Sequence, residues 1–352
     1  MALSGKRNID LKKNEILGLD IGSSAVKMVA LRKNGAGYSA VAAGITEIAP
    51  SENNDDHHGK NTVAAIRECL ERTMAKRKLV VCGISGPEVA VRDFELPSLS
   101  AAEMASAVSL EASQVCPFPA EDSTVDYQLM PNGDKNTKGV LVAAMNTLIT
   151  DKVQLAKEAH LKCVMMDVDG LALLNCFEGL ADGREESEAG RNVAILNVGG
   201  SHTTVAILDN DGWPFIRDMT YAGDDIVRQV AADNDTSTEI VKGILCGDPA
   251  AIGPEVRESM ERACQKLIAD ITGTLRYYAA QGKSNVEKLL VCGGFALAGG
   301  FIELLNSKLG TESVLWNPFK WIPSSASRKR QEVFAKAGPA LAVAAGLAMR
   351  SI

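Results

Sequence analysis

A short pattern occurs twice in this chain, and it limits the folds that the sequence can adopt. The first copy, residues 16–31, has an apolar run up to Asp20, a tight Gly-Ser-Ser turn and a second apolar run. The second copy, residues 195–208, lies about half the 352-residue chain further on and places Asn197 at the position of Asp20. A single turn of this kind also fits an ordinary polar hairpin. Its repetition predicts two related lobes that share one cleft.

Each turn has the composition of a phosphate-binding hairpin. Glycine lets the backbone approach a ligand closely, and successive N–H groups in such a turn can bind an anion. Asp20 lies at the mouth of the first turn, where a hydrated Mg²⁺ requires an oxygen ligand. The predicted phosphate-side residues are Asp20 (also a metal ligand through water), Gly22, Ser23, Ser24, Lys27, Asn197, Gly199, Gly200 and Ser201.

A third glycine-rich turn, residues 292–300, follows the apolar strand at 288–292. The ordered set of two hairpins and this turn resembles the nucleotide signature of the actin, Hsp70 and sugar-kinase superfamily. The resemblance implies an α/β, actin-like ATPase fold, with two RNase H-like lobes around a cleft that binds ATP and Mg²⁺. It adds Gly223, Glu239, Lys242, Gly293, Gly294 and Phe295 as candidate nucleotide-binding residues. Glu239 and Lys242, one helical turn apart, also fit a solvated surface ion pair.

Composition indicates which binding partners and which cellular compartment suit this protein. A net charge of −7 and a pI near 5.3 argue against nucleic acid as a ligand. Eight cysteines without a C-x-x-C pair fit reduced thiols in a cytoplasmic protein. No window reaches the roughly eighteen apolar residues of a membrane span, so we expect no direct membrane insertion. We expect residues 1–14 to be a flexible arm.

The strand and helix patterns along the rest of the sequence predict how the chain divides into two lobes. Strands at 37–47 and 79–84 flank a polar loop at 50–61 and an amphipathic helix at 62–76. We expect lobe one to comprise residues 15–92 and 162–190, with a C-terminal helix at 338–352. After a charged link at 182–191, lobe two spans 191–337 and includes a long helix at 257–281 and a basic loop at 324–331.

We expect residues 93–161 to form a small α+β subdomain that is inserted into lobe one. Ser100 and Glu103 form a capping-box pattern at the start of a helix that reaches residue 115. Two strands, 123–130 and 139–146, flank the turn signal at 131–134. A helix at about 150–159 and a strand at 163–167 return the chain to lobe one.

The whole chain resembles the PilM family of actin-like type IV pilus assembly proteins, itself similar to the division protein FtsA. The residues that carry the resemblance are 94–100, Glu111, 116–119, 126–128, 317–320 and 346–350. The resemblance implies an FtsA-like inserted subdomain and a nucleotide-binding cytoplasmic scaffold of the inner-membrane assembly platform. It further implies docking of the cytoplasmic tail of a PilN-like membrane protein, so that this chain is peripheral to the inner membrane. Pilus motor ATPases remain a further possible partner.

The inserted subdomain carries the residues most specific to the family and has no phosphate turn, so we expect it to recognise the partner. Its apolar corner, Pro117-Phe118-Pro119, fits a groove that takes an extended peptide. Phe118 fits the core of the subdomain equally well. The predicted partner-binding residues are Phe94, Leu96, Pro97, Leu99 and Phe118.

Two departures from the family pattern affect the expected chemistry. Asn197 stands where the family has Asp, and the lost charge weakens Mg²⁺ binding and water activation. Phe295 and Gly299 replace a small residue and a proline, so that Phe295 either stacks on the base or blocks it. We therefore expect ATP binding with slow or absent hydrolysis, and we assign no catalytic residue.

Two other functions fit the same fold. A sugar kinase requires a carboxylate base in the cleft, and the sequence offers no motif for one. A filament-forming protein like FtsA carries a terminal membrane-binding amphipathic helix, and the sequence stops at Ile352 without one. The scaffold is the interpretation we favour.

Overall fold

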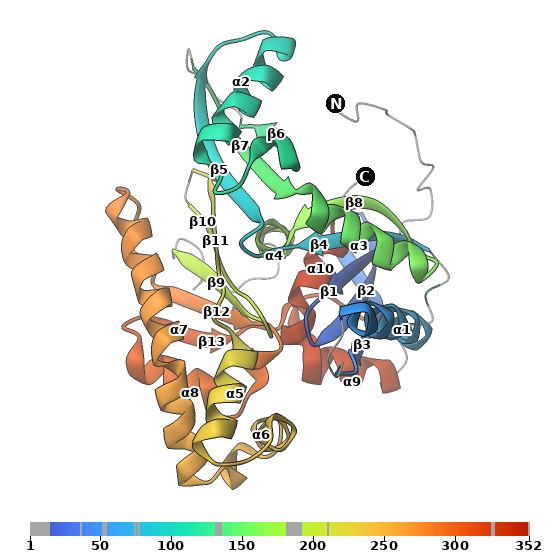
Figure 1. Ribbon diagram of the computed structural model, residues 1–352, viewed down its shortest axis with the longest axis vertical. Helices are drawn as coiled ribbons and strands as arrows, with labels where there is room; N and C mark the ends of the chain where they lie inside the picture. The colour runs from blue at the N-terminus through green and yellow to red at the C-terminus, as the bar shows by residue number, and fades with distance from the viewer. Residues whose placement is uncertain are drawn as a thin grey trace.

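Two five-stranded sheets with the same strand order form the framework of the molecule (Figure 1). This computed structural model describes residues 15–35, 37–50, 55–73, 75, 78–130, 136–180, 192–209, 211–324 and 328–350. The predicted arm at 1–14, the turn at 131–134 and the link at 182–191 therefore lie outside the described residues, as do positions 74 and 76 of the helix predicted at 62–76.

The first sheet has the order β3-β2-β1-β4-β8, and the second has the order β11-β10-β9-β12-β13. In each sheet the first three strands are antiparallel and the last two run parallel to the central strand. The repeat seen in the sequence thus extends to two whole sheets, and the prediction of an actin-like fold is confirmed. The strands are β1 (Glu15–Ile21), β2 (Ala25–Asn34), β3 (Gly37–Glu47), β4 (Leu79–Ile84), β8 (Lys162–Val168), β9 (Val193–Val198), β10 (Thr203–Leu208), β11 (Pro214–Met219), β12 (Lys288–Cys292) and β13 (Glu312–Leu315).

Helices cover both faces of each sheet. Helices α1 (Asp55–Thr73) and α3 (Asn146–Glu158) bury Val63, Ile66 and Ala156 against one face of the first sheet. On the outer face of the second sheet pack α5 (Gly223–Asp233), α6 (Thr238–Leu245), α7 (Pro254–Ala280) and α8 (Phe301–Lys308).

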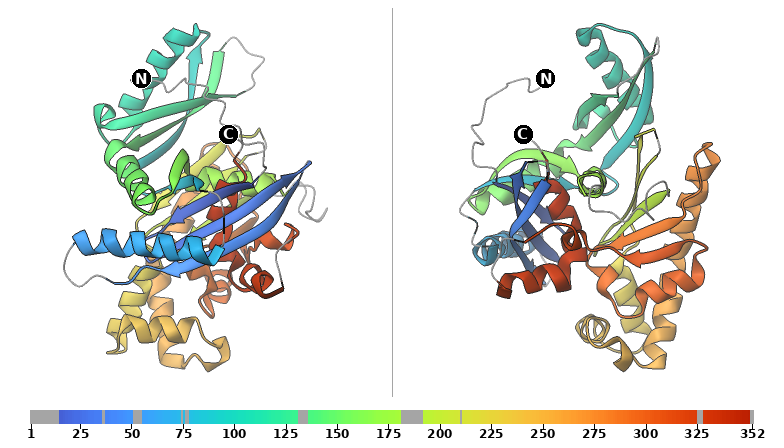
Figure 2. Two further views of the ribbon diagram at one scale, coloured as in Figure 1. Left: turned by 90° about the vertical axis from the view of Figure 1, so that its right-hand side faces the viewer. Right: turned by 180° about the vertical axis from the view of Figure 1, so that it is seen from behind.

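Two helices, α4 (Asp169–Glu178) and α10 (Ala342–Ala348), lie between the two sheets (Figures 1 and 2). One continuous apolar cluster contains Leu173 of α4 and Leu347 of α10 together with Val81 of the first sheet and Ile195 of the second. The apolar segment predicted near the C-terminus is therefore buried, and it joins the two lobes.

A third, three-stranded sheet projects from one end of the molecule (Figures 1 and 2). Its order is β5-β7-β6, formed by β5 (Val89–Pro97), β7 (Asn136–Met145) and β6 (Ser123–Leu129). Helix α2 (Ala101–Val115) covers one face, and the predicted capping box between Ser100 and Glu103 is present. Within the described residues of 93–161, the sheet and α2 have a small apolar cluster of their own.

Several predicted boundaries differ from the structure. Helix α1 begins at Asp55, inside the segment predicted as a polar loop, and α9 (Arg328–Ala337) occupies part of the predicted basic loop. Strand β5 begins at Val89, before the predicted start of the insertion at 93. Helix α3 was assigned to the insertion, but it packs in the core of the first sheet. Polar composition led to the two loop predictions, although helices with one buried face tolerate such composition.

Close packing of α10 against α4 gives a first prediction. A Cβ atom at Gly346 would lie 2.0 Å from the carbonyl oxygen of Ala172. Gly346→Ala should therefore lower the free energy of unfolding by about 2 kcal/mol or more, because the two backbones would have to separate. Urea denaturation monitored by circular dichroism measures the change.

Gly273 provides the matched control, because it lies in α7 with no other group within 4 Å of an added Cβ. Gly273→Ala should raise the free energy of unfolding by about 0.5–1 kcal/mol. Equal stability of Gly346→Ala and the wild type would contradict the claim that this packing is tight.

Candidate functional site

A cavity of about 290 Å³ lies between the two lobes. The turn between β1 and β2 and the turn between β9 and β10 both contribute to its wall, although they are far apart in the sequence. Eleven of the predicted nucleotide-binding residues line it: Asp20, Gly22, Ser23, Ser24, Lys27, Asn197, Gly199, Gly200, Ser201, Gly293 and Gly294.

The two hairpin turns have the same backbone geometry. The N–H of Gly22 donates to the carbonyl of Ala25 at 3.1 Å, and the N–H of Gly199 donates to the carbonyl of His202 at 3.0 Å. The turns also approach each other closely, since a Cβ at Gly200 would lie 2.6 Å from Oγ of Ser23. Any larger residue at position 200 would displace the side chains of Ser23 and Asp224, at the place where the wall of lobe two meets the wall of lobe one.

Asp20 faces the cavity beside a cation of its own hairpin. It lies directly opposite Lys27 in the antiparallel pair, and Nζ of Lys27 is 3.0 Å from Oδ2 of Asp20. Only 9% of Asp20 is exposed, so this pairing offsets part of the cost of burying the carboxylate. The register of the hairpin thus fixes one acid and one base at the mouth of the first turn.

Two charged residues of the cavity were not predicted from the sequence. Lys152 on α3 donates to the carbonyl oxygen of Ile21 at 2.6 Å, and Asp169 is the first residue of α4. Burial lowers the pKa of Lys152, while the nearby carboxylates of Asp169 and Asp20 act in the opposite direction. Burial and, to a smaller extent, the charge of Asp20 raise the pKa of Asp169 to about 7.

Asp169 also has unused hydrogen-bonding capacity. Among the residues that the structure describes, none is hydrogen-bonded to its buried Oδ1. Gly83 of β4 provides the space for this oxygen, since a Cβ there would lie 2.1 Å from it. The cleft therefore contains a buried carboxylate of the kind that a sugar kinase uses as a base, although the sequence has no motif for one. The lack of a motif is thus no reason to exclude an enzyme.

Position in the sheet could have identified Asp169. It directly follows strand β8, which runs parallel to β4 and β1 and is buried at its last two residues. Side chains at the carboxyl ends of parallel strands meet at one edge of the sheet, where Asp20 also lies. Lys152 has no comparable signal, because a lysine in an amphipathic helix is usually on the solvated face.

Lys242 pairs with Asp224, an acidic residue that contacts Ser23 of the cavity wall. Its Nζ is 3.5 Å from Oδ1 of Asp224, and the hydroxyl of Ser23 in lobe one donates to Oδ2 of Asp224 at 3.4 Å. Gly223 supports the second turn, since its N–H donates to the carbonyl of Gly199 at 3.0 Å. Asp224 thus connects the two lobes at the opening.

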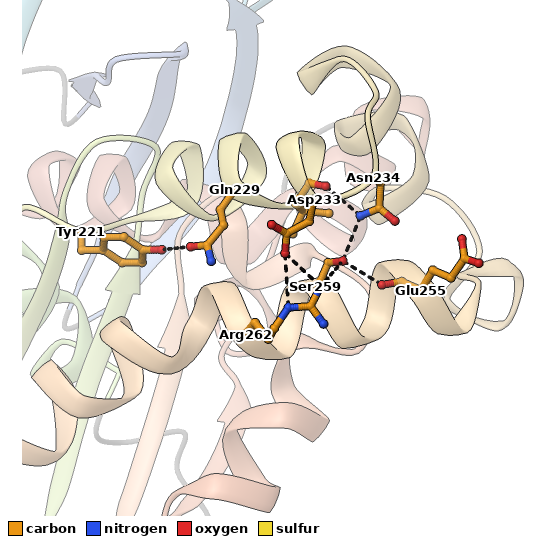
Figure 3. Close-up of polar contacts among 8 residues, drawn as sticks. Tyr221, Gln229, Asp233, Asn234, Glu255, Ser259 and Arg262 are labelled. Atoms are coloured by element: carbon orange, nitrogen blue, oxygen red, sulfur yellow. Dashed lines mark hydrogen bonds and ion pairs between the residues drawn. The ribbon is translucent and has the colours of Figure 1, made fainter.

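Polar contacts join the C-terminal end of α5 to α7 (Figure 3). Asp233 forms an ion pair with Arg262 at 3.0 Å, and the side-chain amide of Asn234 donates to the hydroxyl of Ser259 at 3.0 Å. None of these four residues lines the cavity.

Four predicted nucleotide-binding residues do not line the cavity: Gly223 and Lys242, described above, and Glu239 and Phe295. Glu239 is exposed on α6 and accepts a hydrogen bond from the hydroxyl of Thr238. The ring of Phe295 packs edge-to-face on Phe301, with ring centroids 5.0 Å apart. It also lies against Gly223, where an added Cβ would be 2.8 Å from it. Phe295 therefore supports the position of Gly223 in this structure.

The predicted partner-binding residues fall into two groups. Phe94 is 5% exposed and packs in the core of the third sheet with Tyr127, so in this structure its side chain is not on the surface. Its side chain lies on the face of β5 that α2 covers. Pro97 and Leu99 are exposed at the end of β5, whereas Leu96 and Phe118 are partly buried.

Two lobes with the same strand order, each presenting a glycine-rich hairpin to the cavity between them, define the actin-like ATPase class of fold. Comparison with known families matches residues 18–352 to the family described as type IV pilus assembly protein PilM. The chain belongs to this family.

Two solved structures share the fold of this chain. The solved PilM-PilN type IV pilus biogenesis complex contains a similar chain, with a TM-score of 0.81 and 23% identity over 96% of this chain and 98% of that chain. The ethanolamine utilization protein EutJ from Carboxydothermus hydrogenoformans has a TM-score of 0.57 and 12% identity over 96% and 90% of the chains.

Among curated proteins, the cell division protein FtsA of Bacillus subtilis (strain 168) is 24% identical over 254 residues, which is 65% of this chain and 57% of that protein. This chain therefore matches little more than half the length of that relative. In the part of the chain that the structure describes, no helix combines the length and apolar character needed to cross a membrane.

Proposed function

We propose that the cavity between the lobes binds ATP with Mg²⁺. The observation that carries this proposal is the approach of two glycine-rich turns from opposite lobes to one cavity. Residues 22–24 and 199–201 would hold the phosphates through backbone N–H groups and hydroxyls. Glu239, Lys242, Gly293, Gly294 and Phe295 would lie toward the nucleoside, with Gly223 supporting the second turn.

The charges in the cavity fit a polyphosphate bound to a divalent cation. The carboxylates of Asp20 and Asp169 supply the oxygen ligands that Mg²⁺ prefers, directly or through water. The unpartnered Oδ1 of Asp169 is available for such a contact. Lys27 and Lys152 are the cations of the same wall, and they can turn toward phosphate oxygens.

The volume suits a cleft that closes on its ligand. About 290 Å³ is near the lower limit of small-molecule pockets, which is roughly 300 Å³. The contact between Ser23 and Asp224 brings the two lobes together at the mouth. A nucleotide would enter when this contact opens, and it would stabilise the closed form by binding both turns.

We further propose that hydrolysis is slow, so that the nucleotide acts mainly as a structural ligand. Asn197 provides an amide where a second-hairpin carboxylate would bind a hydrated cation. Asp169 is a possible base for water activation, because its pKa lies near 7. A measurement of the hydrolysis rate therefore needs variants of both Asn197 and Asp169.

Membership of the PilM family supports a scaffold function in type IV pilus assembly. We propose that this chain binds the cytoplasmic tail of a PilN-like inner-membrane protein, as the solved relative is a PilM-PilN complex. This would place the chain in the cytoplasm, at the membrane through its partner. The exposed end of β5, with Pro97, Leu99 and the partly buried Phe118, is the proposed docking surface.

Removal of a cavity charge should weaken nucleotide binding. Asp20→Ala and Lys152→Met should each lower the affinity for ATP with Mg²⁺ about tenfold or more, because each removes a charge-assisted contact. Isothermal titration calorimetry measures the affinity, and circular dichroism checks folding. Asp151→Asn, an exposed change next to Lys152 on α3, is the control and should leave the affinity unchanged. Wild-type affinity in both cavity variants would contradict the proposed site.

The replacement of Asn197 tests the proposed reason for slow turnover. Asn197→Asp should raise the rate of phosphate release about tenfold or more by restoring a carboxylate for the hydrated cation. A phosphate-release assay measures this, with the exposed change Asn285→Asp as the control. Rapid release by the wild type that disappears in Asp169→Asn would overturn the proposal and assign an ATPase activity.

A charge on the docking surface should weaken the partner complex. Leu99→Asp should lower the affinity for a peptide with the sequence of the PilN-like tail about tenfold or more, because it places a charge in an apolar contact. Fluorescence anisotropy measures binding. Leu110→Asp is the control, since Leu110 is exposed on the side of α2 away from its buried residues. If Leu99→Asp and Phe118→Ala both bind like the wild type, the docking surface lies elsewhere.

A further inference from the structure

The turn that leads into the third sheet is held by two side chains of lobe two. Gly86 lies in this turn, between β4 and β5, and its N–H donates to Oδ2 of Asp218 on β11 at 2.8 Å. The ring of His202 lies on its other side, since a Cβ at Gly86 would be 3.0 Å from Nε2. Gly86 has a φ of 107°, a conformation that favours glycine. The turn of one lobe is therefore shaped to fit the other lobe.

Asp218 belongs to a polar row that leads to the second phosphate hairpin. It lies directly opposite Thr204 on β10, which lies directly opposite Asn197 on β9. Residues paired in this way share one face of a sheet. The hydroxyl of Thr204 donates to Oδ1 of Asp218 at 2.5 Å. Thr204, Asn197 and His202 all line the cavity, so a shift of the hairpin would move both groups that hold Gly86.

The same turn is the root of the third sheet. The N–H of Val89, the first residue of β5, donates to the carbonyl of Gly86 at 3.1 Å. The N–H of Met145, the last residue of β7, donates to the carbonyl of Glu88 at 3.0 Å. Strands β5 and β7 then pair along their whole length. Strand β5 is thus anchored at Gly86, the residue that Asp218 and His202 contact, and β7 is anchored at Glu88, two residues further along the same turn.

The bond between Gly86 and Asp218 joins the two lobes. Gly86 follows β4 of lobe one, and Asp218 lies on β11 of lobe two. A hydrogen bond of 2.8 Å loses most of its strength when its atoms separate by about 1 Å. A hinge opening of the cleft that separated the lobes by more than this at Gly86 would therefore break the bond.

We propose that the contact of Asp218 with Gly86 transmits the state of the cleft to the third sheet. A ligand that holds the two phosphate hairpins together fixes Asp218 and His202 around the turn, and this orders the roots of β5 and β7. Asp218 is a positioning residue in this account, because it acts through the Gly86 turn. The inference rests on the proposed nucleotide site and specifies how that site regulates the sheet proposed to bind the partner. Such coupling is reciprocal, so an occupied third sheet favours the closed cleft.

Hydrogen–deuterium exchange of the full chain, with and without ATP and Mg²⁺, tests the proposal. In the wild type, the ligand should slow exchange in the hairpins at 18–24 and 196–204 and also in the third sheet at 89–97 and 136–145. In Asp218→Ala without ligand, exchange in the third sheet should be about three- to tenfold faster, as expected for the loss of a hydrogen bond. Added ligand should then protect the hairpins but not the third sheet.

Two further variants make the result interpretable. Asp233→Asn is the control, because Asp233 pairs with Arg262 (Figure 3) and neither residue lines the cavity. In this variant the ligand should protect the third sheet from exchange as it does in the wild type. Asp218→Asn keeps the shape of the side chain and one acceptor oxygen, and it replaces Asp218→Ala if that variant does not fold.

The possible outcomes separate this inference from the proposed function. Protection of the hairpins without protection of the third sheet in the wild type would overturn the coupling alone. Equal transmission in the Asp218 variant and the wild type would overturn the role of Asp218. No protection of the hairpins in the wild type would overturn the nucleotide site, and the coupling with it.

Discussion

The molecule depends on the tight packing of two helices between two sheets. Helices α4 and α10 approach so closely that Gly346 meets the backbone of Ala172, and α10 meets β1 in the same way, where an added Cβ at Gly18 would lie 2.0 Å from the carbonyl oxygen of Ala344. Because protein interiors are close-packed, neither helix can shift without losing these contacts. This shared core joins the lobes, and it also forms part of the cavity wall, because Asp169 of α4 and Val343 of α10 line the cavity.

Charge in the cavity follows from this geometry. Asp20 and Asp169 come from different strand ends of one sheet, and the closeness of the two carboxylates raises the pKa of Asp169 beyond the effect of burial. Lys27 and Lys152 lie on the same wall and partly compensate the two acids. The wall therefore carries two carboxylates and two lysines. On ligand binding, the ion pairs among them can be replaced by contacts of the carboxylates with a cation and of the lysines with phosphate. The desolvation cost is smaller than for a wall whose charges all have one sign.

Local patterns in the sequence predicted much of the fold. A strand pattern at 37–47 and a continuous apolar run at 79–84 located β3 and β4 at their observed ends, and the internal repeat predicted that two turns far apart in the chain meet. Lys152 and Asp218 escaped prediction because each belongs to an ordinary amphipathic element, and only the tertiary fold brings them to the cleft. The burial of Phe94 could not be predicted either, because its place in the core of the third sheet depends on the packing of α2 against β5.

The two halves of the repeat are similar, but the turns differ at the point of closest approach. Ser23 of the first turn lies opposite Gly200 of the second, and its hydroxyl occupies the space that a side chain at residue 200 would need. A serine at residue 200 would require the side chains of Ser23 and Asp224 to turn away, and their contact across the cleft would be lost. If the lobes descend from a duplicated ancestor, the glycine of the second turn thus leaves room for a contact between the lobes that two identical serine turns would exclude.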